Sequence, residues 1–208
     1  MNLSAYETFV SMDWGYNAFG CALWWVCLPD GHYHIAREYK FKGQTAAVVG
    51  DAIKTITREL RVKRLRYVVA DPAMWGHTGA GKGESIAETL SRQPVGLPMK
   101  KGDNTRQTGW QRLHELFQAA PDGKPWLTID TGCTYLRRTI PAAVSDKSNP
   151  DDVDTTGDDH GLDALRYGAM SRPAPTRLAS TTGTVPAQSA GALFAQAKAD
   201  AERAMYAA

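Results

Sequence analysis

The pattern of apolar and polar residues at the start of the chain is that of β-strands. Three apolar or alternating runs lie close together, over residues 8–14, 19–28 and 32–41. The turn at residues 29–31 (PDG) joins the second run to the third, because proline fixes φ and glycine tolerates a positive φ. The first 41 residues therefore predict an antiparallel meander of three strands.

Helical spacing of apolar residues begins at Thr45, which is placed to cap a helix over residues 45–60. The apolar positions of this helix are Val48, Ala52, Ile53 and Ile56. Further helices are predicted over residues 84–92, 104–120, 133–144 and 158–172, and further strands over residues 64–71 and 125–130, with room for one more strand between residues 92 and 104. A meander followed by alternating strands and helices predicts an α/β fold, a mixed β-sheet with helices on both faces.

The composition changes at Pro173. The sequence before it has the length of one domain with a proper core. The sequence after it is rich in Pro, Thr, Ser and Ala, which is typical of a linker, and residues 189–207 have the pattern of a short amphipathic helix. We therefore expect one domain over residues 1–172 and a tail over residues 173–208.

Hydrophobic residues make up 43% of the chain and charged residues 22%, which is an ordinary globular balance. No apolar run approaches the roughly 20 residues that span a bilayer, and the N-terminus lacks the pattern of a secretory signal. We therefore expect a soluble cytoplasmic protein without a membrane partner. Cys21, Cys27 and Cys133 form no CxxC pair, which favours reduced, buried thiols over a zinc site.

The charges are unevenly distributed, although the net charge is only +2. Residues 54–66 and 92–112 are basic, whereas residues 146–163 are strongly acidic. An acidic cluster beside basic segments is suited to hold cations in one place and a polyanion around them.

Two predicted strands end in an aspartate, Asp13 and Asp71, and a third aspartate, Asp163, lies in an apolar stretch of the last predicted helix. Three carboxylates brought together by the fold would repel one another unless a cation neutralised them. Such oxygen ligands select Mg²⁺ or Mn²⁺, and two of these ions about 4 Å apart suit phosphodiester hydrolysis. The alternative is that each aspartate only caps a helix or opens a turn.

The surroundings of these aspartates resemble the nuclease domain of bacteriophage large terminases. The matching segments contain Asp13 in DWG, Asp71 in DPA, and residues 159–167, DHGLDALRY, which are similar to the family's DHxxDAxRY signature. Residues 104–116 are also similar to a helix of that family with the pattern Arg-x-x-Gly. The resemblance covers residues 8–172 and implies a ribonuclease-H-like fold.

By this resemblance, Asp13, Asp71 and Asp163 are the catalytic metal ligands of an Mg²⁺- or Mn²⁺-dependent endonuclease with two metal ions. The family cuts concatemers of double-stranded viral DNA during genome packaging, in the cytoplasm of an infected or lysogenic bacterial host. Its partners are a packaging ATPase domain, the small terminase and the portal.

Other residues of the signature have two interpretations each. Asp159 is either an additional metal ligand or a helix N-cap. His160 lies one helical turn before Asp163 and either supports the metal site or is a solvent-exposed residue at the start of a helix. Arg166 and Tyr167 are expected to pack and form ion pairs rather than to act in catalysis.

The ATPase domain of a complete large terminase has no counterpart in this sequence. Residues 76–83 fit the pattern GxxxxGK, but Gly83 stands where a P-loop needs Ser or Thr for Mg²⁺. We therefore expect no ATP site in this chain and place Lys82, in this glycine-rich loop, near a DNA phosphate. The ATPase domain was then either removed or is separately encoded.

Basic residues outside this loop are candidates for phosphate contacts that depend on salt. Solvated surface charges are the alternative for each of them. The candidates are Lys100, Lys101, Arg106, Arg112, Arg137 and Arg138.

Two other functions fit the same pattern. A Holliday-junction resolvase or a transposase-type nuclease would share the fold and the aspartates but act on another DNA substrate. A DNA-binding or assembly module would use the aspartates structurally and gain no nuclease activity with Mn²⁺.

Overall fold

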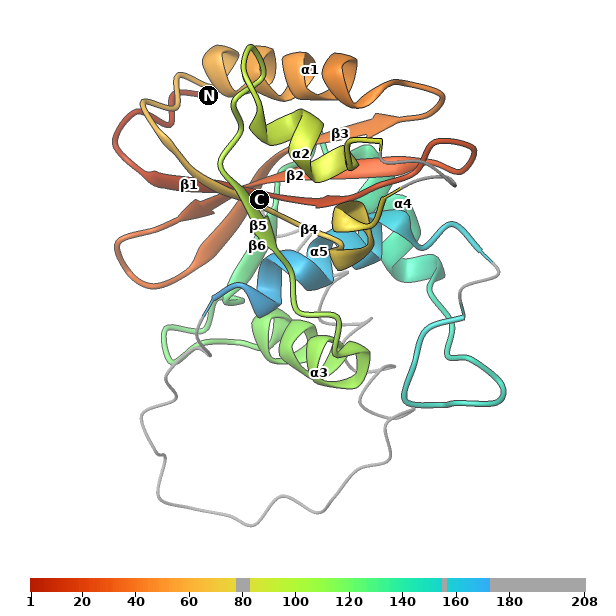
Figure 1. The fold of residues 1–208 in the computed structure, drawn as a ribbon. Helices are drawn as coiled ribbons and strands as arrows, with labels where there is room; N and C mark the ends of the chain where they lie inside the picture. The colour runs from red at the N-terminus through yellow and green to blue at the C-terminus, as the bar shows by residue number, and fades with distance from the viewer. Residues whose placement is uncertain (78–82, 155–156, 173–208) are drawn as a thin grey trace.

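The computed structural model of the chain describes residues 1–77, 83–154 and 157–172 (Figure 1). The expected tail over residues 173–208 and Lys82 of the glycine-rich loop lie outside the described residues. Among the described residues, no helix is long and apolar enough to cross a membrane.

Six strands form one sheet in the order β5-β4-β1-β2-β3-β6. Strands β1, β2 and β3 pair antiparallel, whereas β4 pairs parallel with β1, β5 parallel with β4, and β6 parallel with β3. The predicted meander and the predicted mixed sheet are therefore confirmed. The strands are β1 (Glu7–Asp13), β2 (Gly20–Cys27), β3 (Tyr33–Phe41), β4 (Leu65–Ala70), β5 (Met99–Lys101) and β6 (Leu127–Ile129).

Helices cover both faces of the sheet (Figure 1). One face packs against α1 (Ala46–Glu59) and α2 (Ile86–Ser91), and the other packs against α3 (Arg106–Phe117), α4 (Thr134–Ala142) and α5 (His160–Met170). A short 3-10 helix, η1 (Pro72–Trp75), follows β4. Successive residues of a strand point to opposite faces, so that Trp24 lies in the core under α1 and Trp25 in the core under α5.

The first helix begins where the sequence predicts. The Thr45 hydroxyl accepts a hydrogen bond from the backbone N–H of Val48, which confirms the predicted cap. The predicted apolar face is only partly correct, since Ile53 is buried but Val48 is 53% exposed. Helix α1 therefore turns a narrower apolar stripe toward the sheet than its sequence suggests.

Helix α5 lies across the middle of the sheet and contacts β1, β2 and β4 as well as α3 and α4 (Figure 1). It approaches the sheet closely at Gly168, where an added Cβ would lie 2.3 Å from the indole ring of Trp25. On its other side, Gly109 of α3 gives room to the side chain of Arg166. The small residues at these crossings allow α5 to lie between the sheet and α3.

Candidate active site

Two of the three aspartates lie side by side at one edge of the sheet. Asp13 is the last residue of β1, and Asp71 directly follows β4. These strands are parallel neighbours, with Met12 opposite Ala70, and the backbone N–H of Asp71 donates to the carbonyl of Met12 over 3.3 Å. The carboxyl ends of both strands therefore bring their aspartates to the same place.

Helix α5 delivers the third aspartate and a histidine to this edge. His160 and Asp163 lie one turn apart on the helix, as predicted. The Nδ1 atom of His160 lies 2.7 Å from Oδ2 of Asp13. His160 is thus a direct partner of Asp13 rather than a free residue at the start of a helix, and the hydrogen bond raises the pKa of its imidazole.

Asp13 is 7% exposed, and its environment disfavours its negative charge. Burial is the main cause that raises the pKa of Asp13 to about 6. The hydrogen bond with His160 opposes this shift, while the negative charges of Asp163 and Asp71 add to it. Asp71 and Asp163 are therefore both close enough to act on the charge of Asp13.

Asp163 is held by two arginines. Nη1 of Arg106 lies 3.1 Å from both carboxylate oxygens, and Nε of Arg166 lies 2.9 Å from Oδ1. Arg166 is completely buried, and its guanidinium also donates to the side chain of Asn104. In the part of the chain that the structure describes, no group of three or more His, Cys, Asp or Glu side chains is arranged so that it could hold a metal ion. Asp163 is therefore paired with cationic side chains, although its charge still acts on Asp13.

The three aspartates have the donor chemistry of a divalent metal site, although their side chains do not form a metal-binding group in the described structure. Carboxylate oxygens are the ligands that Mg²⁺ and Mn²⁺ prefer. The raised pKa of Asp13 reflects a buried negative charge with two like charges nearby, which is the condition that a cation relieves.

Arg106 also connects the aspartates to the loop before α5. Its Nε donates to the carboxylate of Asp152 at 2.8 Å, and the indole Nε1 of Trp110 donates to the same carboxylate at 2.7 Å. Although burial raises the pKa of Asp152, these hydrogen bonds hold it below its ordinary value. Asp152 and Asn104 were not predicted at this site. Asp152 belongs to the acidic run at 146–163, but no residue pattern distinguishes it from its acidic neighbours.

Asp158 fixes the segment that leads into α5. Its carboxylate accepts hydrogen bonds from the hydroxyl of Tyr135, from Nζ of Lys40 at 3.2 Å and from Nη2 of Arg138 at 3.4 Å. The next residue, Asp159, occupies the N-cap position without a side-chain capping bond. Burial and the charge of Asp163 raise the pKa of Asp159.

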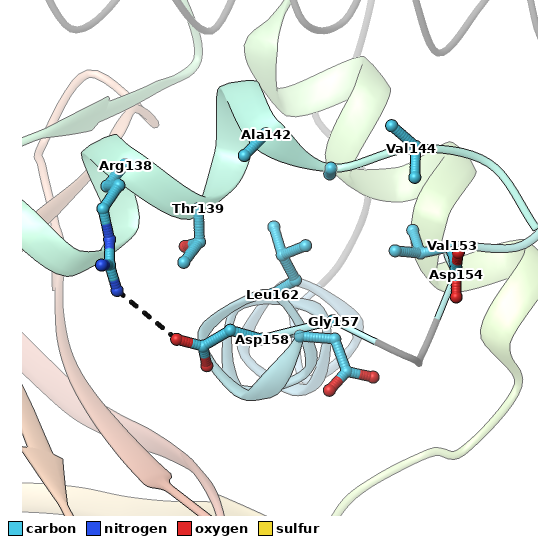
Figure 2. A pocket seen from close by; sticks show the side chains of 11 residues that line it. Arg138, Thr139, Ala142, Val144, Val153, Asp154, Gly157, Asp158 and Leu162 are labelled. Atoms are coloured by element: carbon cyan, nitrogen blue, oxygen red, sulfur yellow. Dashed lines mark hydrogen bonds and ion pairs between the residues drawn. The ribbon is translucent and has the colours of Figure 1, made fainter.

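A cavity of about 450 Å³ opens beside this segment, between α4 and the start of α5 (Figure 2). Val144, Val153 and Leu162 form much of its apolar wall, and the Arg138–Asp158 ion pair lies at its edge (Figure 2). Asp159 also lines it, so that the cavity adjoins the aspartate cluster.

Comparison with solved structures places the chain in a known fold. The large terminase of a thermophilic bacteriophage matches with a TM-score of 0.61 and 19% identity over 80% of this chain and 40% of that chain. The P22 large terminase nuclease domain matches with a TM-score of 0.60 and 19% identity, over 81% of this chain and 82% of that domain. The chain has the fold of large-terminase nuclease domains.

A third structure with this terminase nuclease fold is the large terminase nuclease of the thermophilic phage G20c with bound cobalt. It has a TM-score of 0.52 and 13% identity over 79% of this chain and 81% of that chain. No protein-family model and no curated protein sequence match the chain. The chain spans about 40% of the length of the first of these three proteins.

Within the terminase nuclease fold, the basic residues predicted to contact DNA occupy different environments. Arg112 pairs with Glu115 and donates to the carbonyl of Arg172, and Arg137 donates to the carbonyl of Thr131. Arg106 is held within the aspartate cluster, as described above. Lys100 and Lys101 are exposed on the edge strand β5, with Nζ of Lys100 lying 4.7 Å from the ring centroid of Tyr67.

Proposed function

We propose that this chain is a metal-dependent endonuclease that cuts double-stranded DNA. In this proposal Asp13, Asp71 and Asp163 are the catalytic metal ligands, and Asp159 is a candidate fourth. The observation that carries the proposal is the buried carboxylate of Asp13, bonded to His160 of α5 and placed beside Asp71 by the pairing of β1 with β4, in the fold of terminase nuclease domains.

The side chains around the aspartates would orient them. His160 holds Asp13 by one oxygen, and Arg166 holds Asp163 from within the core. Asp71 accepts a hydrogen bond from the backbone N–H of Ala73 through Oδ1 at 2.9 Å. Each carboxylate therefore has a partner that limits its rotation. Two Mg²⁺ or Mn²⁺ ions bound there would lower the pKa of a water molecule and stabilise the departing 3′ oxygen.

The proposal extends to viral genome packaging. A chain that spans about 40% of the large terminase of a thermophilic bacteriophage needs a packaging ATPase domain, on the same or another polypeptide, to act as a complete terminase. The substrate is then a concatemer of viral DNA in the cytoplasm of a bacterial host, and the small terminase and portal are the remaining partners. Lys100, Lys101 and Arg138 are proposed phosphate contacts, because phosphate binding needs cationic side chains at the surface and all three are exposed. Lys82, which lies outside the described residues, is a proposed contact on its charge alone.

The test is cleavage of supercoiled plasmid in Mn²⁺ and in Mg²⁺. Asp13→Asn, Asp71→Asn and Asp163→Asn should each reduce cleavage by more than the roughly 10- to 100-fold lost with a supporting residue at a metal site. EDTA should stop the wild-type reaction. Asp51→Asn, on the exposed side of α1, is the matched control and should cut normally. Cleavage that persists in EDTA would exclude the metal mechanism.

The substrate is tested separately with a four-way DNA junction and a linear duplex of equal length. Comparable cutting of both supports the terminase-type nuclease. Strong preference for the junction would instead support a Holliday-junction resolvase, and wild-type protein that cuts nothing with either metal would support a binding or assembly module.

A further inference from the structure

Cationic and aromatic side chains alternate along one flank of the aspartate cluster. Nζ of Lys40 lies 3.6 Å from the ring centroid of Phe19 and 4.0 Å from that of Tyr135. Nζ of Lys42 lies 5.0 Å from the Phe19 centroid, and the guanidinium carbon of Arg138 lies 5.8 Å from the Tyr135 centroid. These five residues form one continuous ladder from the loop after β1, across the end of β3, to α4.

The ladder begins two strands away from Asp13. The sheet register aligns Asp13 with Cys21 and Cys21 with Lys40, and side chains in such a row point to the same face. Neighbouring strands are about 4.8 Å apart, so that the backbone of Lys40 lies roughly 10 Å from that of Asp13. Lys40 also binds Asp158, two residues before His160. The ladder is therefore attached directly to the segment that carries His160 to the site.

The two ends of the ladder are accessible to solvent, whereas the charge at its centre already has partners within the protein. Lys42 is exposed and forms no ion pair with any of the described residues. The side chain of Arg138 is 68% exposed despite its ion pair with Asp158. Lys40 is only 24% exposed, because Asp158 and the two aromatic rings surround its ammonium group. Lys40 thus orders the rings, while Lys42 and Arg138 remain open to a ligand.

The aromatic ring of Phe19 adds an apolar surface between these cations. Phe19 is 37% exposed, and Tyr16 in the same loop is 53% exposed. The loop is held against the end of β3 by a hydrogen bond from the backbone N–H of Gly43 to the carbonyl of Tyr16. Exposed aromatic rings next to cations are suited to a polyanion that also has an apolar face, such as the sugar–phosphate backbone of DNA.

We propose that this ladder binds the backbone of the DNA duplex beside the cleavage site, with Lys42 and Arg138 contacting phosphates and Phe19 contacting a deoxyribose. This inference rests on the proposed nuclease function and adds a binding surface that composition did not indicate, since Lys42 and Phe19 lie outside the basic segments of the chain. It implies that the duplex also extends across the start of β2 and the end of β3, on the other side of the aspartates from Lys100 and Lys101 on β5.

The experiment measures duplex binding without cleavage. Fluorescence anisotropy of a labelled duplex of about 30 base pairs, long enough to cover several phosphate contacts, is recorded in EDTA with Asp13→Asn as the background, over a series of salt concentrations. Lys42→Ala should reduce the slope of log K against log salt by about one, and Lys42→Ala with Arg138→Ala by about two, because each phosphate contact contributes about 0.9. Lys42→Arg should retain the slope, and Phe19→Ala should lower affinity with the slope unchanged.

Lys63→Ala is the matched control, because Lys63 is an exposed lysine before the start of β4, at the opposite end of the sheet from Asp71. It should leave both affinity and slope unaltered. Circular dichroism confirms that each variant is folded. A slope unchanged in the folded double variant would overturn the ladder as a phosphate site. Failure of the nuclease proposal is seen separately, as wild-type protein that does not cut plasmid with either metal.

Discussion

The carboxylate of Asp13 is buried and lies near the negative charges of Asp163 and Asp71. We therefore expect its ionised form to destabilise the folded protein. The raised pKa of Asp13 means that folded protein holds the carboxyl proton more tightly than unfolded protein. Protonation of Asp13 therefore contributes to the free energy of unfolding in full below about pH 4, and this contribution is lost as the pH rises through about 6.

Asp13→Asn should therefore increase the free energy of unfolding at pH 7 in EDTA by about 1–3 kcal/mol, because the shift of the pKa from 3.8 to about 6 has that size. Urea unfolding at pH 7 and at about pH 4 measures the effect, which should disappear at the lower pH. Asp51→Asn is the control without a buried carboxylate. Equal stability of Asp13→Asn and wild type at pH 7 would show that the aspartate charge is already compensated.

His160 should matter for catalysis through the carboxylate that it holds. His160→Ala removes the partner at 2.7 Å from Asp13 and should lower plasmid cleavage by roughly 10- to 100-fold, the usual effect of losing a supporting residue at a metal site. The apparent Mn²⁺ affinity, measured by isothermal titration calorimetry, should fall with it. His160→Gln, which keeps a hydrogen-bonding group, should recover part of the loss. Unchanged metal affinity in His160→Ala would limit the histidine to a structural role.

The sequence predicts the aspartates better than it predicts their partners. Asp13 and Asp71 are recognisable because each ends a short apolar strand, and Asp163 because it interrupts an apolar helix. Arg166, three residues after Asp163 on the same helix, was expected to pack and to form an ion pair, and it does both. The second arginine on Asp163 could not be predicted in that way. Arg106 is 57 residues from Asp163, and nothing local distinguishes an arginine in an ion pair from one that is free to contact DNA.

At the level of elements, the start of α4 is stabilised by a side chain from the sheet. Its N-cap residue, Cys133, makes no side-chain capping bond. Instead, the carboxylate of Glu38 on β3 accepts hydrogen bonds from the backbone N–H groups of Tyr135 at 2.6 Å and Leu136 at 2.9 Å. A negative charge at this position also interacts favourably with the helix dipole.

Glu38→Gln should therefore lower the free energy of unfolding by about 1 kcal/mol, since it weakens the cap and removes the charge that faces the helix dipole. Chemical denaturation at pH 7 measures the change. Glu59→Gln, at the exposed end of α1, is the matched control and should alter stability little. A loss in Glu59→Gln as large as that in Glu38→Gln would point to a general charge effect.

Helix α5 depends on glycine at its crossing with β2. Gly168→Ala would place a Cβ 2.3 Å from the Trp25 ring, which is buried and cannot move freely. We expect the free energy of unfolding to fall by about 1–3 kcal/mol, although alanine is the better helix former. Thermal denaturation measures it, with Gly157→Ala, where an added Cβ meets nothing within 4 Å, as the control. A gain in stability would show that the contact between α5 and β2 can accommodate the added methyl group.

Most helices and strands were predictable because their periods are long and clear, as in α1 and the meander. For β5, the sequence indicated only that one more strand could lie between residues 92 and 104. A strand of three residues is too short to show a period of alternating apolar and polar positions. The cap from Glu38 could not be predicted either, because Glu38 is separated by 97 positions from Tyr135 and by 98 positions from Leu136 in the sequence.

At the level of the whole molecule, the parallel pairing of β1 with β4 and the crossing of α5 bring distant carboxylates to one edge of the sheet. Metal binding at that edge should stabilise the entire domain, because a ligand that binds only the folded state adds RT ln(1 + [L]/Kd). Mn²⁺ at about 100 times its Kd should thus add about 2.7 kcal/mol to wild type. Differential scanning fluorimetry should show this shift in wild type and in Asp51→Asn but not in Asp163→Asn. A shift that survives in Asp163→Asn would move the metal elsewhere.

The overall topology was predictable from the order of elements, and the fold match with terminase nuclease domains confirms it. The DNA-binding surface was less predictable, because basic segments of the sequence are not basic surfaces of the molecule. Arg112 lies in a basic segment but has protein partners, whereas Lys42 lies outside these segments and is exposed.

The position of α5 in the chain has a consequence for synthesis. The helix that supplies Asp163 and His160 is the last described element, yet it rests on the central strands, which are the first to be made. While translation is under way, Asp13 has neither its histidine nor its third carboxylate neighbour. A growing polypeptide on the ribosome therefore lacks the assembled acidic cluster, and the proposed cutting activity appears only after the whole domain has emerged.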